Sequence, residues 1–592
     1  MSVQERERDV APAPPTLPAP GRRSVLRREA VVLGAFVALA VLLFRGAWAD
    51  PAHRLIGAPG DPLLFVWYLR WVPWAISHGH NPLFSSYVNA PHGMNLMWNT
   101  AVLLLSVLFA PLTAWLGPMI TYNVLATAGV AVSGWTASLV FRRVGRLGWG
   151  AYLGGLLFAF SPFLVSQSLG HLHLTTVFLL PVLALAAHEV AVVQQWSPFR
   201  GGLVLGALAA AQALIGEEVL AIAAVGLLAA ALIGAGLDRR GAVARLRHVG
   251  RALPWSAGAF VVLAGGPLLF QFAGSQAIHG PVQPRDFYVA DLWAPVVATR
   301  FQWWHPFAAI GHDFQSRGAE WSAFLGVPVL VIVAAVVVAQ RRKRGVLVAG
   351  LTLVAVVLFS FGPHLHVDGH RTVIPMPWLL VGWIPPLDSV LPVRLMLDAD
   401  FIAAGLVGLA LESAWRARSF LPRVLAAAGG GLMLATLFPN PMFDWSTPVV
   451  PAFFSSRSVR DIAPGSLVAI APYPSPPNVM TMAWQVAARF RYRSFGAYAL
   501  VPGADGRPSF TGPPTALGLV LASVQSGSAP DALDFQSLIA ARQELLANHV
   551  SVAIVGPMAN QTRAVALFTT LMGHGPRFED GVYLWTGGVT GA

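Results

Sequence analysis

Long apolar segments separated by short polar ones recur along the first three quarters of the chain. A helix of about 20 mostly apolar residues is long enough to cross the hydrocarbon core of a bilayer. The pattern predicts eleven spans, at residues 30–47, 119–140, 149–165, 172–193, 201–215, 218–236, 252–272, 322–339, 345–361, 399–415 and 421–438. The pair at 201–215 and 218–236 has an alternative interpretation, as one long helix that breaks at Gly216.

A further apolar stretch, residues 99–116, decides the direction of every later span. Basic residues collect in the cytoplasmic loops of membrane proteins. The basic clusters of this chain lie at 22–28, 142–146, 239–251, 341–344 and 416–423. If 99–116 does not cross, all of them are cytoplasmic, whereas a crossing moves 142–146 outside. Pro111 interrupts the stretch and Gly117-Pro118 ends it, which suits a bent segment. We therefore interpret 99–116 as a re-entrant or juxtamembrane segment on the outer face.

This topology places the polar motifs together on the outer side. They comprise Asp61, Asn81 and Asn95 in the first loop, His171 and His173 in the second, Glu217 and Glu218 in the third, Arg300 and Glu320 in the fourth (273–321), and residues 364–371 with Arg394 in the fifth (362–398). Short basic loops on one side and long polar loops on the other suit an enzyme that acts at the outer membrane surface.

The composition agrees with a polytopic membrane protein. Hydrophobic residues make up 55% of the chain and charged residues 11%, against about 25% charged in soluble proteins. The net charge of +12 comes mainly from the arginine clusters between apolar segments, so it indicates topology and no nucleic-acid partner. The abundance of Ala, Gly, Pro and Arg is typical of a bacterial chain. The absence of cysteine excludes disulfides and thiolate chemistry. No nucleotide-binding glycine motif is present.

The two ends of the chain differ from the middle. Residues 1–29 are polar and Pro-rich, and we expect a disordered cytoplasmic tail. Residues 439–592 contain no apolar run of membrane length, and we expect an extracytoplasmic α/β domain. Its predicted strands are 466–471, 550–555 and 581–586. Its predicted helices are 534–549, with Leu538, Leu545 and Leu546 inward, and a second helix from Asn560, its cap, to Met572.

Asp61 is the candidate catalytic residue. It stands in Gly60-Asp61-Pro62, before a helix on which Trp67, Trp71 and Trp74 recur on one face. Tryptophan favours the headgroup depth of a bilayer, so we expect this helix to lie flat on the outer leaflet. A carboxylate held there could act as a general base toward a hydroxyl group. The alternative is that Asp61 caps the helix that starts at Pro62, and both roles can hold together.

The other candidates would bind substrate or metal. The residues considered for the donor phosphate or another part of the substrate are Arg394, His171, His173, Asn81, Asn95 and Arg300. Arginine suits phosphate because its guanidinium group has fixed donors. The alternative for Arg394 is that its side chain only extends to the membrane interface. The alternative for the asparagines is that they form turns. Glu217 and Glu218 are adjacent acids at the start of a helix. They could bind a divalent metal, or they could be there because the positive end of the helix dipole stabilises negative charge. Residues 364–370 could bind metal or form a solvated loop.

Several of these features resemble one family of membrane enzymes. Gly60-Asp61-Pro62, the aromatic helix, Asn81-Pro82-Leu83, the Pro91-His92-Gly93 turn, and Phe160-Ser161-Pro162-Phe163 before Gly170-His171 are similar to those of bacterial GT-C-type glycosyltransferases. The 99–116 segment resembles the juxtamembrane hairpin of lipid A aminoarabinose transferases and protein O-mannosyltransferases. The resemblance covers residues 30–438. Many members have a second acid after the first-loop aspartate, whereas here Pro62 follows, which leaves Asp61 as a lone base.

The resemblance implies a mainly α fold, a helical membrane bundle with the outer α/β domain attached. It also implies a polyprenyl-phosphate sugar as donor, inversion at the anomeric carbon, and a glycan or lipid acceptor on the outer face of the cytoplasmic membrane. Two alternatives from other classes stay open at this point. The chain could transport or flip a lipid-linked sugar, or it could be a non-catalytic envelope scaffold.

Overall fold

The computed structural model describes residues 22–475, 478–512, 514–527 and 534–589. Most of the expected N-terminal tail, residues 1–21, lies outside the described residues. The first helix begins at Arg22, so the last part of the expected tail, residues 22–29, is helical and continues directly into the first apolar segment.

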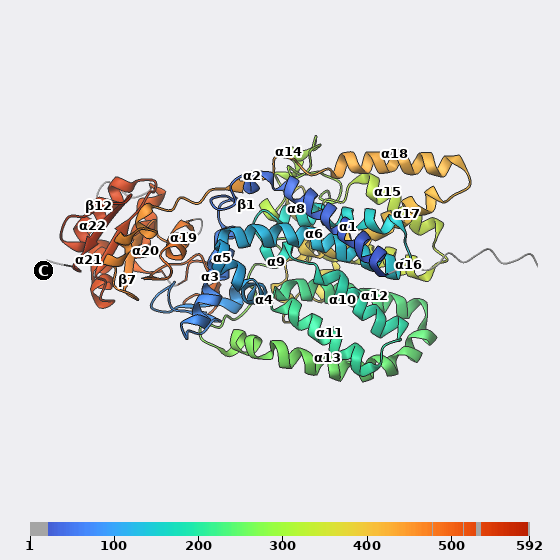
Figure 1. Cartoon of the computed structure of the whole chain (residues 1–592), viewed down its shortest axis with the longest axis horizontal. Coiled ribbons are helices and arrows are strands. Elements are labelled where there is room, and N and C mark those ends of the chain that lie inside the picture. Colours follow the sequence, from blue (N-terminus) through green and yellow to red (C-terminus); the bar gives the residue numbers. More distant parts are fainter. Residues whose placement is uncertain (1–21, 476–477, 513, 528–533, 590–592) are drawn as a thin grey trace, which may run out of the picture.

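Helices form the N-terminal three quarters of the chain. They are α1 (Arg22–Leu43), α2 (Arg45–Trp48), α3 (Asp61–Ser77), α4 (Leu103–Leu108), α5 (Ala110–Leu116), α6 (Pro118–Val144), α7 (Trp149–Ala159), α8 (Pro162–Gln167), α9 (Leu172–Thr175), α10 (Leu179–His188), α11 (Pro198–Ala213), α12 (Glu217–Leu237), α13 (Arg239–Ala273), α14 (Ala308–Gly311), α15 (Val327–Ala339), α16 (Arg344–Ser360), α17 (Met396–Trp415) and α18 (Phe420–Leu437). The longer helices run along the long axis of the molecule, and the C-terminal region lies at one end of it (Figure 1).

Five segments of the described chain are long and apolar enough to cross a membrane. They are Pro118–Val144, Trp149–Gln167, Glu217–Leu237, Arg239–Ala273 and Phe420–Leu437. Along α13 and α18 most side chains point outward from the protein, and large apolar residues are exposed on both. Apolar surface of this extent suits contact with lipid. The molecule is therefore a multi-pass membrane protein, while the number of spans stays a prediction, since α15 and α16 are apolar but shorter.

The stretch 99–116 is bent, as its sequence predicts. It forms two short helices, α4 and α5, which meet at Phe109, and Pro111 stands in the first turn of α5. Gly117 ends the segment with a φ of 88°, a conformation that favours glycine. Thirteen helical residues rise about 20 Å, less than the hydrocarbon core of about 30 Å. This geometry supports the interpretation that the segment does not cross.

Ion pairs connect the basic clusters at the end of the bundle away from the C-terminal region. Arg142, at the end of α6, pairs with Glu29 on α1. Arg344, at the start of α16, pairs with Asp238, which follows α12, at 2.8 Å. Glu412 near the end of α17 pairs with Arg416 and accepts hydrogen bonds from the backbone N–H groups of Gly148 and Gly150, at the start of α7. These contacts agree with the expectation that the clusters share one side of the membrane.

The tryptophan face of α3 is covered by protein. Trp67 and Trp71 are fully buried and stack on each other with ring centroids 5.2 Å apart. Both rings contact Phe490 edge to face, and Trp67 Nε1 donates to Gln485 Oε1 at 2.8 Å. The prediction that this face lies on the outer leaflet is therefore wrong. An apolar stripe indicates that a helix face avoids water, but it does not distinguish lipid from another part of the same chain.

The C-terminal region contains a five-stranded sheet of order β12-β13-β11-β7-β8. Its strands are β7 (Leu467–Ala471), β8 (Arg493–Ser494), β11 (Val552–Val555), β12 (Arg577–Glu579) and β13 (Val582–Thr586), and its helices are α19 (Met480–Ala487), α20 (Ala516–Ser526), α21 (Phe535–Ala547) and α22 (Gln561–Met572). β7, β11 and β13 lie where the sequence predicts strands, and α21 and α22 where it predicts helices.

Two details of that prediction are wrong. Leu546 is exposed, while Leu545 beside it is fully buried. Asn560 precedes α22 in a left-handed conformation and makes no side-chain cap; its Nδ2 donates instead to the carbonyl of Val524 at 3.0 Å. α19, α20 and the short edge strands have no counterpart in the prediction, because their apolar runs are brief.

Part of the C-terminal region shares a core with the first loop. Val479, Met482 and Phe490 pack in the same buried cluster as the α3 tryptophans. A short strand after α18, β6 (Trp445–Ser446), also pairs with β1 (Leu55–Ile56), which precedes α3. These contacts hold the C-terminal region against the first loop, next to the start of α3.

The topology generates a first prediction. If 99–116 does not cross, α6 places His92 and Arg146 on opposite sides of the membrane. Both side chains are exposed, and the chain has no cysteine of its own. In intact cells, an impermeant maleimide should label His92→Cys and leave Arg146→Cys unlabelled until the membrane is permeabilised. Labelling of both from outside would show that 99–116 crosses.

Candidate functional site

Six side chains from six separate segments meet beside the start of α3. We call Asp61, His171, Glu218, Glu320, Arg394 and Tyr498 the polar cluster. Each of the five outer loops of the predicted topology contributes one residue, and the C-terminal region contributes the sixth. Glu320 ends the short helix η3 (Gly318–Glu320), and Arg394 lies in η6 (Pro392–Leu395), directly before α17.

Asp61 is held by two side chains and does not cap its helix. The helix begins at Asp61 itself, its N-cap position is Gly60, and the structure shows no side-chain cap there. Asp61 Oδ1 accepts a hydrogen bond from the Tyr498 hydroxyl at 2.8 Å. Asp61 Oδ2 lies 3.1 Å from His171 Nε2. The interpretation of Asp61 as a cap is therefore wrong, and its carboxylate, 31% exposed, is free for another role.

The surroundings of Asp61 favour its ionised form. Burial acts to raise its pKa, but the hydrogen bond and charge of His171, the hydrogen bond from Tyr498 and the charge of Arg394 outweigh burial. The pKa of Asp61 therefore lies below its ordinary value. Burial and the charge of Asp61 both raise the pKa of Tyr498, so this hydroxyl keeps its proton and donates it to the carboxylate. Asp61 is consequently a carboxylate at neutral pH.

A buried glutamine orients the ring of His171. Gln167 Nε2 donates to the carbonyl of Ala319 at 3.1 Å and to Glu320 Oε2 at 3.2 Å. Both partners only accept hydrogen bonds, so the amide nitrogen must face them and Gln167 Oε1 must face His171 Nδ1, at 2.5 Å. His171 Nδ1 therefore carries a hydrogen. The other ring nitrogen, Nε2, is the one that faces Asp61.

Arg394 is buried between two carboxylates. Its Nε donates to Glu320 Oε1 at 3.1 Å and its Nη2 to the same oxygen at 2.5 Å. Its Nη1 donates to Glu218, whose other oxygen accepts from the backbone N–H of Leu391 at 3.1 Å. The side chains of Arg394 and Glu320 are only 11% and 5% exposed. Burial acts to raise the pKa of Glu320, but the charge of Arg394 outweighs it and keeps this pKa below its ordinary value.

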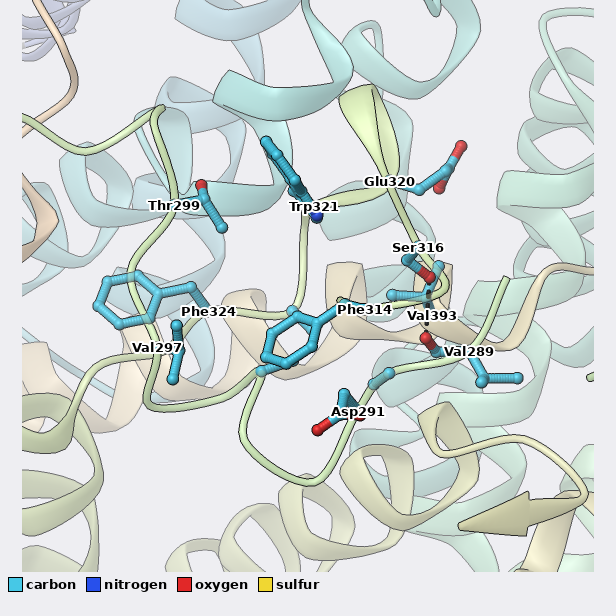
Figure 2. Close-up of a pocket in the computed structure, with 13 residues that line it drawn as sticks. Val289, Asp291, Val297, Thr299, Phe314, Ser316, Glu320, Trp321, Phe324 and Val393 are labelled. Carbon is cyan, nitrogen blue, oxygen red and sulfur yellow. Dashed lines mark hydrogen bonds between the residues drawn. The ribbon is translucent and has the colours of Figure 1, made fainter. Parts of the chain in front are cut away.

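An apolar cavity adjoins the polar cluster behind Glu320. The cavity is small, and Val289, Phe314, Trp321, Phe324 and Val393 are among its walls. Figure 2 shows Glu320 at the edge of the cavity, with its carboxylate turned away from the two phenylalanine rings. That carboxylate binds Arg394 instead. The cavity therefore lies behind the polar cluster and gives no access to the carboxylates of that cluster from this side.

Four of the predicted binding residues have structural roles outside the cluster. Asn81 Oδ1 accepts from the backbone N–H of Leu83 at 2.9 Å in a turn. Asn95 is buried; it caps the following short helix and also donates to backbone carbonyls at the end of α13. Arg300 pairs with Asp444 at 2.9 Å on the surface. His173 is buried against the ring of Phe65, with centroids 5.9 Å apart, and faces Gly216.

The predicted metal ligands do not fit a metal site. Glu217 and Glu218 are adjacent on a helix and point in different directions. Glu218 binds Arg394, whereas Glu217 lies in a separate small pocket with Ala101 and Leu214. Residues 364–370 belong to a hairpin of β4 (His364–Val367) and β5 (His370–Pro375). In the part of the chain that the structure describes, no group of three or more His, Asp or Glu residues is arranged to bind a metal.

Sequence reasoning missed two members of this site. Gln167 is a polar residue at the end of the apolar segment Trp149–Gln167, a signal that could have singled it out. Tyr498 has no comparable signal, because it stands in an irregular stretch more than 400 residues from Asp61. In the sequence, Glu320 is one of several polar residues of the fourth loop.

Sequence and structure comparisons place the chain among known proteins. The family described as "Domain of unknown function (DUF6311)" matches residues 31–389. No curated protein has a sequence that matches this chain.

Solved structures resemble the fold at low sequence identity. The apo oligosaccharyltransferase of Archaeoglobus fulgidus superposes with a TM-score of 0.51 and 11% identity, over 92% of this chain and 71% of that one. A mutant of the arabinofuranosyltransferase AftD from mycobacteria gives 0.53 and 14%, over 95% of this chain and 42% of that one. ArnT from Cupriavidus metallidurans, bound to undecaprenyl phosphate, gives 0.40 and 15%, over 95% and 99%. The first two likenesses show that the chain has the GT-C fold, as the first-loop motifs predict.

The polar cluster generates a prediction about stability. Replacing Arg394 with Met leaves two buried carboxylates without their partner, which should cost about 3–5 kcal/mol. The matched control is Arg300→Met, which breaks a surface pair and should cost about 0–1 kcal/mol. Equilibrium unfolding in mixed micelles measures both. Adding Glu218→Gln and Glu320→Gln to Arg394→Met should recover part of the loss. Equal losses for the two arginine variants would contradict the buried ion pairs.

Proposed function

This chain belongs to the DUF6311 family, and we propose that it is a membrane glycosyltransferase that uses a polyprenyl-phosphate sugar as donor. The acceptor is a glycan or lipid hydroxyl on the outer face of the cytoplasmic membrane. One observation carries the proposal: an ionised, partly exposed carboxylate, Asp61, lies with a buried arginine, Arg394, where the five loops that the predicted topology places outside meet. Transfer of a sugar from a lipid phosphate requires a base and a cation in this proximity.

The proposed reaction is a single displacement. The acceptor hydroxyl attacks the anomeric carbon and loses its proton to Asp61, while the bond from that carbon to the phosphate oxygen breaks. The electron pair of the broken bond stays on the phosphate, and the configuration at the anomeric carbon inverts. A weakly basic carboxylate is sufficient, because a hydroxyl becomes strongly acidic as its oxygen bonds to an electron-poor carbon.

Arg394 has donors to spare for the leaving phosphate. A guanidinium group carries five N–H donors. In the described part of the chain, Nε, one N–H of Nη1 and one of Nη2 bind Glu218 and Glu320. Two N–H groups are left for a phosphate oxygen. Its two carboxylates hold the guanidinium group in position before the substrate arrives, so little reorganisation is needed during the reaction.

The solved relatives with the same fold support sugar transfer as the class of reaction. One is named an oligosaccharyltransferase and the other an arabinofuranosyltransferase. Since their sequences are only 11% and 14% identical to this chain, they indicate the fold, and the chemistry rests on the polar cluster. No step of the proposed reaction uses a metal, because Glu218 is already bound to Arg394.

Asp61 provides the direct test. Asp61→Asn keeps an acceptor for Tyr498 but cannot take up a proton, so transfer should fall by about 10²-fold or more while the protein remains folded. The measurement is the glycan composition of the cell envelope, by mass spectrometry, in a deletion strain complemented with either form. Transfer from a synthetic polyprenyl-phosphate sugar in isolated membranes gives the rate.

A matched control lies in the same loop. Asp50 is a more exposed aspartate that pairs with His53 at 2.9 Å, as Asp61 pairs with His171. Asp50→Asn should leave the envelope glycans unchanged. Full complementation by Asp61→Asn would exclude Asp61 as the base and with it the proposed mechanism.

The pairing of Asp61 with His171 generates a pH prediction. His171 lowers the pKa of Asp61 by its hydrogen bond and its charge, while burial acts in the opposite direction. His171→Ala removes the lowering contribution, so the pKa of Asp61 should rise. The acid limb of the pH–rate profile, where Asp61 becomes protonated, should then move to higher pH than in the wild type. His53→Ala is the control and should leave the limb in place. An unmoved limb in His171→Ala would show that the titration of Asp61 does not limit the rate.

A further inference from the structure

The fifth outer loop contains a segment that does not suit exposure to water. Residues 372–387, sixteen in a row, include no charged side chain. Several apolar side chains of this run point outward: Val373 is 94% exposed, Leu380 72% and Trp383 60%. Soluble surfaces seldom carry contiguous apolar patches of this kind. We therefore expect this face to contact something other than water.

The segment is anchored to the bundle from its inner side. Trp378, in the short helix η4 (Pro377–Leu380), is fully buried, and its ring lies 6.1 Å from that of Phe359 on α16. The exposed side chains are therefore not the result of a detached loop. One tryptophan fixes η4 against the end of α16, and Leu379 and Leu380 remain on its outer side.

The outward apolar face continues that of α16. On this helix Leu351, Val354 and Leu358 are exposed and recur at helical spacing, so they form one stripe along its outer side. η4 packs against α16, and Trp378 contacts Phe359 near the end of that helix. The exposed apolar residues of the helix and those of the loop thus belong to two elements that contact each other.

We propose that residues 373–384, here called the lipid-contact segment, lie in the bilayer interface at the end of the molecule that carries the polar cluster. The backbone of this segment is partly strand and partly short helix, and such irregular structure is not stable in contact with the hydrocarbon centre. Trp383 and its apolar neighbours suit the depth of the headgroups, where tryptophan is enriched. The partner is the lipid surface itself.

The position of the segment matters for the proposed function, on which this consequence rests. Eight residues after it, η6 carries Arg394 and packs against both α16 and α12. A phosphate at headgroup depth beside the lipid-contact segment is therefore close to the guanidinium group that would bind it. The segment would set the depth at which a lipid-linked donor meets the polar cluster.

Depth-dependent quenching tests the proposal. Because the chain has no cysteine, Leu380→Cys can carry a single environment-sensitive fluorophore in vesicles of phosphatidylcholine and phosphatidylglycerol. Val262→Cys, on the outward face of α13, is the reference for the bilayer interior, and Gln536→Cys, exposed on α21, is the reference for water. Leu380→Cys should be quenched severalfold more than Gln536→Cys by nitroxides on the lipid headgroup. Nitroxides deep in the acyl chains should quench it less than Val262→Cys.

Three other results would overturn the proposal. Quenching of Leu380→Cys like that of Gln536→Cys would place the segment in water. Quenching like that of Val262→Cys would place it in the bilayer interior. Protection of Leu380→Cys from both lipid and aqueous quenchers would indicate a protein partner. The measurement does not depend on catalysis, so the same label in an Asp61→Asn background should report the same depth. Failure of the proposed mechanism and failure of the lipid-contact segment are therefore separate outcomes.

Discussion

The interaction on which the site depends is the burial of Arg394 between Glu218 and Glu320. Removing charges from water is costly, and the cost is recovered only when the partners are close and hydrogen-bonded. Here the partners come from the start of α12 and the end of the fourth loop, while Arg394 itself lies in η6, directly before α17. The ion pairs therefore join three segments that would otherwise be free to separate. They also place a fixed positive group next to Asp61.

Asp61 shows how the C-terminal region takes part in the site. Tyr498 reaches the first loop because α19 and Phe490 pack on the tryptophan face of α3. The same packing that positions α3 thus supplies the hydroxyl that donates to its first residue. The C-terminal region is more than a cover: without it Asp61 would lose one of its two hydrogen-bond partners.

A chain of side-chain contacts connects Asp61 to Arg394 through neutral and ionisable groups. His171 faces Asp61, Gln167 binds both His171 and Glu320, and Glu320 binds Arg394. Because each partner restricts the protonation or orientation of the next, the proposed base and the proposed phosphate ligand are held in one network. Such networks are stable only when all members are satisfied.

The sequence by itself determined the class of the protein and the ends of its bundle. The length of apolar runs and the position of arginine clusters are local properties of the sequence, because a helix must bury or expose its own residues. These properties predicted the membrane helices, the bent 99–116 segment and several C-terminal strands. The motif around Asp61 likewise predicted the GT-C fold. The tertiary structure alone decided which side chains contact one another across distant parts of the chain. The carboxylate of Asp61 meets Tyr498, the tryptophans of α3 meet Phe490, and Glu218 meets Arg394 in place of a metal. These contacts join residues up to several hundred positions apart, and no local pattern records which distant side chain will satisfy a buried charge or cover an apolar face.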